Sequence, residues 1–201
     1  MNTLSGAVTV SAGTLALATS AGSALGSTNG VTVNSGGTLL LGASNQINNS
    51  AGMTLAGGTF ATGNFSEGAT NAAGVGALTL TAAGSHLDFG TGTVGVLSFA
   101  SFAPGANSLT IDNWTGLANT VGTASTDRLI FDLTQSANLA SFTFSGYASG
   151  AVQFDLGNGF FELTPVTPVP EPATCLAGAP HSLPWDLGSI AGAQRLVKGP
   201  G

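Results

Sequence analysis

Apolar residues and hydroxyl-bearing residues alternate in short runs along roughly the first ninety positions of the chain. The runs recur in units that begin at Val8, Val31, Met53 and Leu78, so the period is 22 to 25 residues. Each unit contains an apolar-Thr-apolar run, a turn of small residues, and a second alternating run that opens with Thr or Ser. A period of two places the apolar side chains on one face of a β-strand and the hydroxyls on the other. Each unit is therefore expected to form two short strands joined by a turn.

A unit with a single apolar face cannot bury that face alone, whereas stacked units can. Stacking about 4.8 Å apart brings equivalent positions into columns inside a coil of strands. An antiparallel sandwich has no reason to repeat one turn at this period, a propeller blade needs about 40 residues, and the Gly, Thr, Ser and Val content disfavours helices. The pattern therefore predicts an all-β fold, namely a parallel β-solenoid (β-helix). Two internal columns are expected, one of Val8, Val31, Met53 and Leu78 and one of Leu15, Leu39 and Phe60.

Beyond residue 95 the repeat dissolves, and aromatic and acidic residues become frequent. Runs between 96 and 164 still have the alternation and composition of strands. The last rung of a solenoid exposes unpaired strand edges and an apolar end, so it needs a cap. The chain is expected to divide into solenoid repeats (1–95), closing rungs with a β-rich C-terminal cap (96–164), a Pro-rich linker (165–174) and an atypical, disordered tail (175–201).

Charge is scarce, which narrows the classes of function. Charged residues make up 6% of the chain, against roughly 25% in typical globular domains. The net charge is −6 with three Lys and Arg residues, too few for the phosphate neutralisation on which nucleic-acid binding depends. Apolar residues come in threes and fours, so no run of about 20 crosses a bilayer as a helix. The lone Cys175 excludes an internal disulfide and a multi-cysteine metal site.

The repeat units resemble a known family. The unit at 31–41 and its counterparts are similar to the autotransporter-associated β-strand repeat, also called the passenger-associated transport repeat. The resemblance covers about the first ninety residues, with three good copies. It implies a β-solenoid carried by an exported bacterial surface protein.

A second resemblance begins after the Pro-rich linker, at Val169, Pro170, Glu171 and Pro172. These residues resemble the opening of the PEP-CTERM sorting signal, and 109–114 and 126–131 are similar to the region that often precedes it. The resemblance implies a Gram-negative bacterium that makes extracellular polysaccharide. It also implies an exosortase-type sorting enzyme that recognises Glu171 and its flanking prolines, followed by a membrane helix and a short basic cluster.

The tail departs from that pattern. Where an apolar helix is expected, the chain has Pro180, His181, Pro184 and Asp186, and only Arg195 and Lys198 stand in the place of a basic cluster. We therefore expect no membrane span in this chain as written, and a frameshift or gene-model error near 176–180. The first residues also lack the basic start and apolar core of a signal peptide. Since a sorting signal requires export, the chain is expected to be the C-terminal fragment of a longer protein.

Two clusters invite a catalytic interpretation. The pattern at 90–95 formally matches a dinucleotide-binding glycine loop, but that chemistry needs a following helix, and a β-like run follows here. Ser85, His86 and Asp88 also lie close together in the sequence. At i and i+2, His86 and Asp88 share the outer face of the expected strand, which permits a metal or a base–orienter pair. Solvated strand residues are the preferred interpretation, because no second His lies in the folded region.

The other acids lie whole strands apart, so their proximity cannot be read from the sequence. Paired carboxylates for polysaccharide cleavage would have to come from Asp112, Asp127, Asp132 and Asp155. Arg128, the only basic residue in this region, is expected to pair with Asp127 or Asp132. Trp114 and Tyr147 are candidate glycan contacts, with core packing as the default for Trp114. Neither catalytic residues, cofactor nor metal is assigned.

These observations favour an exported, non-enzymatic structural protein of the cell surface or extracellular matrix. It would present a rigid, weakly charged rod coated with Thr, Ser and Asn, in contact with cell-envelope polysaccharide. The alternative is an adhesin or glycan-binding module that uses the aromatics and acids of the cap. The third hypothesis is a fragment of a carbohydrate-active β-helix enzyme whose catalytic residues lie upstream.

Overall fold

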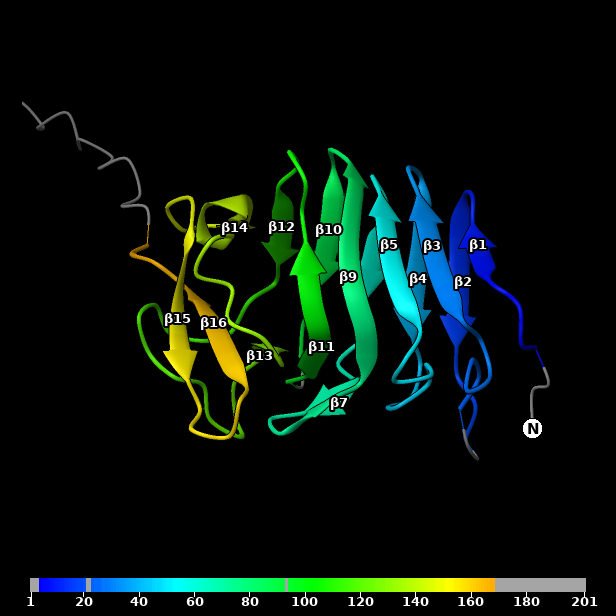
Figure 1. Cartoon of the computed structure of the whole chain (residues 1–201), viewed down its shortest axis with the longest axis horizontal. Coiled ribbons are helices and arrows are strands. Elements are labelled where there is room, and N and C mark those ends of the chain that lie inside the picture. Colours follow the sequence, from blue (N-terminus) through cyan, green and yellow to red (C-terminus); the bar gives the residue numbers. More distant parts are fainter. Residues whose placement is uncertain (1–3, 21–22, 93, 169–201) are drawn as a thin grey trace, which may run out of the picture. The chain divides into compact units, whose positions relative to one another are not determined.

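The chain folds as a stack of parallel coils, which confirms the predicted all-β solenoid. The computed structural model describes residues 4–20, 23–92 and 94–168. The motif at 169–172 and the tail lie outside the described residues. Each successive coil gives one strand to each of two sheets, so residues 21 to 33 positions apart in the sequence pair on neighbouring parallel strands (Figure 1). The helical content of this region is one 3₁₀ turn, η1 (Leu139–Ser141).

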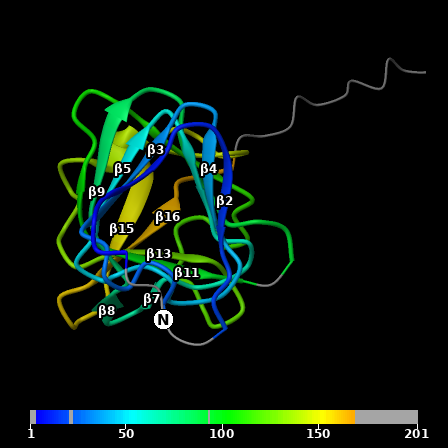
Figure 2. The same ribbon diagram turned by 90° about the vertical axis from the view of Figure 1, so that its right-hand side faces the viewer.

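Two sheets face each other across the core, as the view along the stack shows (Figure 2). In spatial order, the eight-stranded sheet contains β1 (Val8–Val10), β3 (Gly30–Asn34), β5 (Gly52–Ala56), β9 (Val75–Ala82), β11 (Val96–Ala103), β13 (Arg128–Phe131), β16 (Phe161–Pro165) and β15 (Ala151–Asp155). The six-stranded sheet contains β14 (Phe142–Phe144), β12 (Leu109–Asp112), β10 (Ser85–Asp88), β6 (Thr59–Ala61), β4 (Gly37–Leu41) and β2 (Gly13–Leu17). A short antiparallel hairpin is formed by β7 (Gly68–Ala69) and β8 (Ala72–Ala73).

The two predicted columns are present. In the eight-stranded sheet Val8 pairs with Val31, Val31 with Met53, and Met53 with Leu78. In the six-stranded sheet Leu15 pairs with Leu39 and Leu39 with Phe60, and that column continues through Leu87, Ile111 and Phe144. From Val31 and Leu39 onward these side chains are buried. The core is therefore a set of ladders, each of which adds one apolar side chain per coil.

Glycines turn the chain from one sheet to the other. Gly36 has φ of +79° and Gly84 has φ of +74°, a region that side chains other than glycine rarely adopt. Both lie at the tight turn between the two strands of one coil. The recurrence of glycine at this turn follows from the backbone conformation that each coil requires.

Parallel pairing continues beyond residue 95 and ends in an antiparallel cap. Strands β11 and β12 pair in parallel with β9 and β10, and β13 and β14 follow in the same way. Antiparallel pairing begins where β16 joins β13 and β15 joins β16. This hairpin covers the edge that the last parallel strand of the eight-stranded sheet would otherwise expose. Within 96–164 the chain thus supplies both further coils and a capping hairpin.

Candidate functional site

The outer face of the six-stranded sheet carries a column of threonines that is interrupted once. The residues in this column are Thr14, Thr38, Thr59, His86, Thr110 and Thr143. The adjacent outward column contains Ala16, Leu40, Ala61, Asp88 and Asp112. Charged side chains thus replace hydroxyls and methyls at β10 and β12. We call His86, Asp88, Asp112, Asn113 and Ser145 the outer polar cluster.

Hydrogen bonds fix the members of the outer polar cluster relative to one another. His86 Nδ1 lies 2.6 Å from Asp112 Oδ2, and Ser145 Oγ donates to Asp112 Oδ1 at 2.5 Å. Asp88 Oδ1 accepts from Asn113 Nδ2 at 2.6 Å and from the backbone N–H of Gly90 at 2.8 Å. The side chains of His86 and Asp112 are 38% and 30% exposed, so the cluster is open to solvent. The described residues form no pocket here or elsewhere.

The hydrogen-bond partner of His86 lies on the neighbouring coil, and not on its own strand. Both His86 and Asp88 lie on the outer face of β10, as expected, but the hydrogen-bond partner of His86 is Asp112 on β12. Asp112 pairs in register with Asp88, so neighbouring coils bring the two carboxylates together. Ser85 is buried and its hydroxyl donates to the carbonyls of Leu55 and Ala82, so it serves the core. The sequence does not reveal the His86–Asp112 pair because the register across 89–108 depends on irregular loops.

Trp114 and Tyr147 lie at the corner where β12 and β14 end. The indole of Trp114 packs edge to face against Phe89 and Phe144, with ring centroids 5.3 and 5.0 Å apart. Tyr147 Oη donates to the Gly116 carbonyl at 3.3 Å. Both aromatic side chains are partly buried against the core. Trp114 therefore has a packing role.

The glycine-rich segment at 90–95 leads into β11 (Val96–Ala103), a strand. A dinucleotide site of this type requires a helix N-terminus after the glycines. The Gly95 N–H instead donates to Asp127 Oδ1 at 2.9 Å. The described residues of this segment therefore connect two strands of the solenoid, β10 and β11.

The remaining acids do not converge. Asp127 is buried, and its Oδ2 accepts from the backbone N–H and the hydroxyl of Thr115. Asp132 is exposed in the loop that follows β13, and Asp155 is exposed at the end of β15. In the part of the chain that the structure describes, no three His, Cys, Asp or Glu side chains are placed to hold a metal ion.

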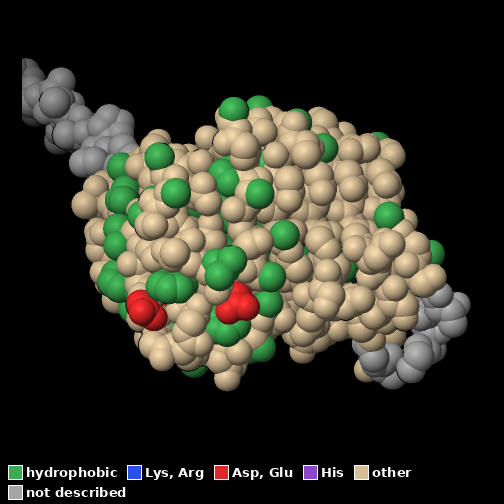
Figure 3. Space-filling model, in the orientation of Figure 1, with side chains coloured by type: hydrophobic (Ala, Val, Ile, Leu, Met, Phe, Trp, Pro, Cys, Tyr) green, Lys and Arg blue, Asp and Glu red, His purple; other side chains and the backbone are tan. Residues whose placement is uncertain are grey.

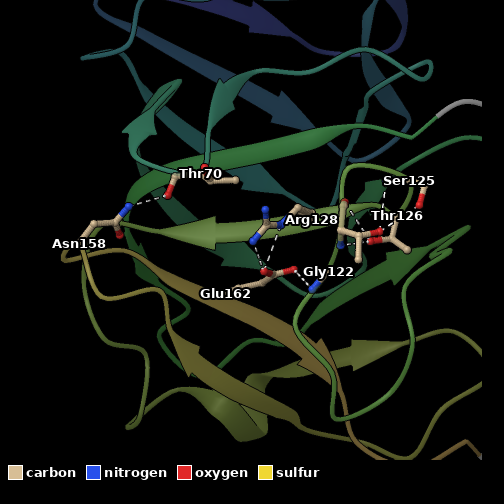
Figure 4. Close-up of polar contacts among 8 residues, drawn as sticks. Thr70, Gly122, Ser125, Thr126, Arg128, Asn158 and Glu162 are labelled. Carbon is tan, nitrogen blue, oxygen red and sulfur yellow. Dashed lines mark hydrogen bonds and ion pairs between the residues drawn. The ribbon is translucent and has the colours of Figure 1, made fainter.

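The expected pairing of Arg128 with Asp127 or Asp132 is wrong. Arg128 Nη2 and Nε lie 2.5 and 3.1 Å from Glu162 Oε2, which is fully buried on β16 (Figure 4). Glu162 Oε1 accepts the backbone N–H of Gly122 at 2.9 Å, which anchors the loop that precedes β13. Arg128 points to Glu162 because β16 pairs antiparallel beside β13. The ion pair therefore fastens the cap to the last coils.

Glu67 is a buried acid that the sequence analysis did not single out. Its Oε2 and Oε1 accept the backbone N–H groups of Gln46 and Ile47 at 2.8 and 3.1 Å. Burial raises the pKa of Glu67 from 4.5 to about 7, while the two backbone hydrogen bonds oppose that rise. Gln46 in turn bonds to the backbone of Thr19 one coil earlier. These side chains join three successive coils at the corner opposite the glycine turns.

Comparisons with protein-family models, curated proteins and solved structures find no match for this chain. Among the described residues, no helix has the length and apolar character needed to cross a membrane.

Proposed function

We propose that the chain is an exported, non-enzymatic structural protein of the cell surface or extracellular matrix. The observation that carries the proposal is the uninterrupted stack of coils with hydroxyls outside. Thr9, Thr32, Thr54 and Thr79 pair in register along the outer face of the eight-stranded sheet. The face in Figure 3 shows few charged or apolar side chains, and most of it is backbone and side chains of other kinds. A surface of this kind suits contact with hydrated polysaccharide without electrostatic attraction or repulsion.

Sorting to the envelope is the second part of the proposal. It is supported by the resemblance of Val169, Pro170, Glu171 and Pro172 to the PEP-CTERM motif, which would make an exosortase-type enzyme the partner. The stack itself supplies stiffness, because each coil is hydrogen-bonded along both sheets to the next. A rod of stacked coils holds a surface away from its point of attachment.

The test is fractionation of a tagged chain in a Gram-negative host that has an exosortase. A signal peptide is added, and residues 176–201 are replaced by the apolar helix and basic cluster that the sorting signal requires after its motif. The expected result is recovery with the cell envelope and the polysaccharide matrix. The Glu171→Ala variant, and the unchanged chain in an exosortase-deficient host, should remain in the inner membrane because the sorting signal is not processed. Equal distribution of the unchanged chain and the Glu171→Ala variant in both hosts would contradict the sorting proposal.

A glycan-binding module is the alternative, favoured by the outer polar cluster and by the partly buried Trp114. This cluster is the one place on the described surface where His, Asp and Asn side chains bond to one another across coils. Binding to a glycan array by the purified chain, lost in a cluster variant, would support this function. A structural protein that makes no specific sugar contact gives no signal on the array.

A further inference from the structure

The two ends of the stack differ in how far their strands are covered. At one end the antiparallel hairpin of β15 and β16 lies beside β13, and its inward side chain Leu163 is fully buried. At the other end β1 and β2 are the outermost strands of their sheets (Figure 1). Val8 and Leu15, which begin the two internal columns, are only partly buried, whereas Val31 and Leu39 one coil later are buried. The first coil therefore leaves the end of the core partly open.

The outer edge of β2 carries backbone groups that point away from the stack. The N–H of Gly13 and the carbonyl of Leu17 bond to the next coil. The backbone groups of successive residues in a strand point to opposite sides, so those of Thr14 and Ala16 point to the open side. No strand in the described part of the chain pairs with that side. An unpaired edge of this kind is a template for pairing with another chain.

This edge lacks the features that usually prevent such pairing, which are charged side chains, prolines and β-bulges. The first charged side chain of the sequence is Glu67 and the first proline is Pro104. The strands β1 and β2 pair with the next coil without a shift in register. At the opposite end, by contrast, the outermost strand β15 ends in the exposed Asp155. Two copies of the chain can therefore meet at their first coils without like charges facing each other.

We propose that the first coil is an interface through which two copies of this chain join end to end. The edge is complementary to itself: β2 pairs antiparallel with β2 of the second copy, with Leu15 opposite Leu15. Thr14 of one copy then exchanges both backbone hydrogen bonds with Ala16 of the other, and β1 continues its own sheet in the same way. The inward side chains still face the core, and the exposed parts of Val8 and Leu15 become buried. A twofold contact of this kind is closed, so the assembly stops at two copies.

The test is sedimentation equilibrium of the full chain at physiological salt over a range of concentrations, which should show a monomer–dimer equilibrium. In the variant Thr14→Lys/Ala16→Lys, lysines of the two copies lie directly opposite one another, so the dissociation constant should rise at least about tenfold. The matched control is Thr38→Lys/Leu40→Lys, which adds the same charges at the paired positions one coil further in. Salt screens those more distant charges, so the control should change the dissociation constant by less than about twofold. Circular dichroism checks that both variants keep the fold.

A mixture of Thr14→Lys/Ala16→Lys with Thr14→Glu/Ala16→Glu tests the register. Opposite charges then face each other across the pair, so the mixed dimer should form more tightly than a dimer of either variant alone. Three results overturn the inference. A monomer at every concentration would show that a different partner covers this end, assemblies that grow beyond two copies would show head-to-tail contacts, and unchanged association of the edge variant would place the interface elsewhere. None of these results bears on sorting to the envelope, which depends on residues 169–172.

Discussion

Glu67 accepts the backbone N–H of Gln46 at 2.8 Å from a fully buried position one coil further along the stack. The carboxyl group thereby accepts hydrogen bonds from backbone N–H groups at a corner of the coil, where no neighbouring strand pairs with them. Burial disfavours its ionised form, and the pKa rises to about 7. The stability of this corner is consequently expected to depend on pH.

The first prediction follows from that pKa. Between the unfolded pKa of 4.5 and the folded pKa of about 7, the folded chain binds more protons than the unfolded chain. The contribution of Glu67 is therefore fully present below pH 4.5 and is lost as the pH rises through 7. A shift of this size corresponds to about 3 kcal/mol of unfolding free energy. Urea denaturation at several pH values between 4.5 and 8.5 should show stability falling across this range.

The control for that prediction is Glu67→Gln. The amide cannot ionise, so the fall in stability assigned to Glu67 should disappear. At low pH the variant should be less stable than the wild type by roughly 1–3 kcal/mol, because the amide N–H₂ faces a backbone N–H of the Gln46–Ile47 corner. A wild-type pH dependence that survives unchanged in the variant would show that another group causes it.

The second prediction concerns the internal columns. Phe60 is fully buried between Leu39 and Leu87, so Phe60→Ala should cost about 3–5 kcal/mol through lost burial and an internal cavity. The matched control is Thr59→Ala, one residue earlier on the same strand and facing outward, which should change stability by less than about 0.5 kcal/mol. Denaturation midpoints measure both. Similar losses at the two positions would contradict the inward–outward alternation.

The columns could be predicted from the sequence because one face of every coil must be apolar. A register error of one residue would turn that face outward, so the spacing of Val8, Val31, Met53 and Leu78 determines which strands meet. The alternation and the period alone determine this pairing, and the loops, whose length varies from coil to coil, do not affect it.

The polar contacts could not be predicted in the same way. His86 meets Asp112, and Arg128 meets Glu162, through pairings that depend on loop length and on the reversal of strand direction at β16. Beyond residue 95 no repeat indicates which residues of neighbouring strands pair. The prediction for Arg128 therefore rests on acids that are close in the sequence, and it is wrong. Glu67 was overlooked because a single acid in a polar loop carries no signal of burial. Only the stacking of the corners shows that it is enclosed.

The third prediction tests the ion pair that fastens the cap. Arg128→Met leaves Glu162 buried without its charged partner, so the unfolding free energy should fall by about 3–5 kcal/mol. The double variant Arg128→Met/Glu162→Gln removes the buried charge and keeps an acceptor for the Gly122 N–H, so it should recover a large part of that loss. Equilibrium denaturation of Arg128→Met, of Glu162→Gln and of the double variant gives the coupling free energy between the two side chains. Additive losses would show that the pair is not coupled.

The last prediction separates packing from recognition at Trp114. The indole lies against Phe89 and Phe144, and its Nε1 is buried without a hydrogen-bond partner. Trp114→Ala should therefore cost about 2–4 kcal/mol by removing aromatic contacts and leaving a cavity. Trp114→Phe keeps a ring in place and removes an N–H that bonds to nothing, so it should cost less than about 1.5 kcal/mol. If Trp114→Phe instead keeps stability but weakens binding to a neutral hexasaccharide, the exposed part of the indole contacts sugar. If both variants leave stability unchanged, the packing role assigned to Trp114 is wrong.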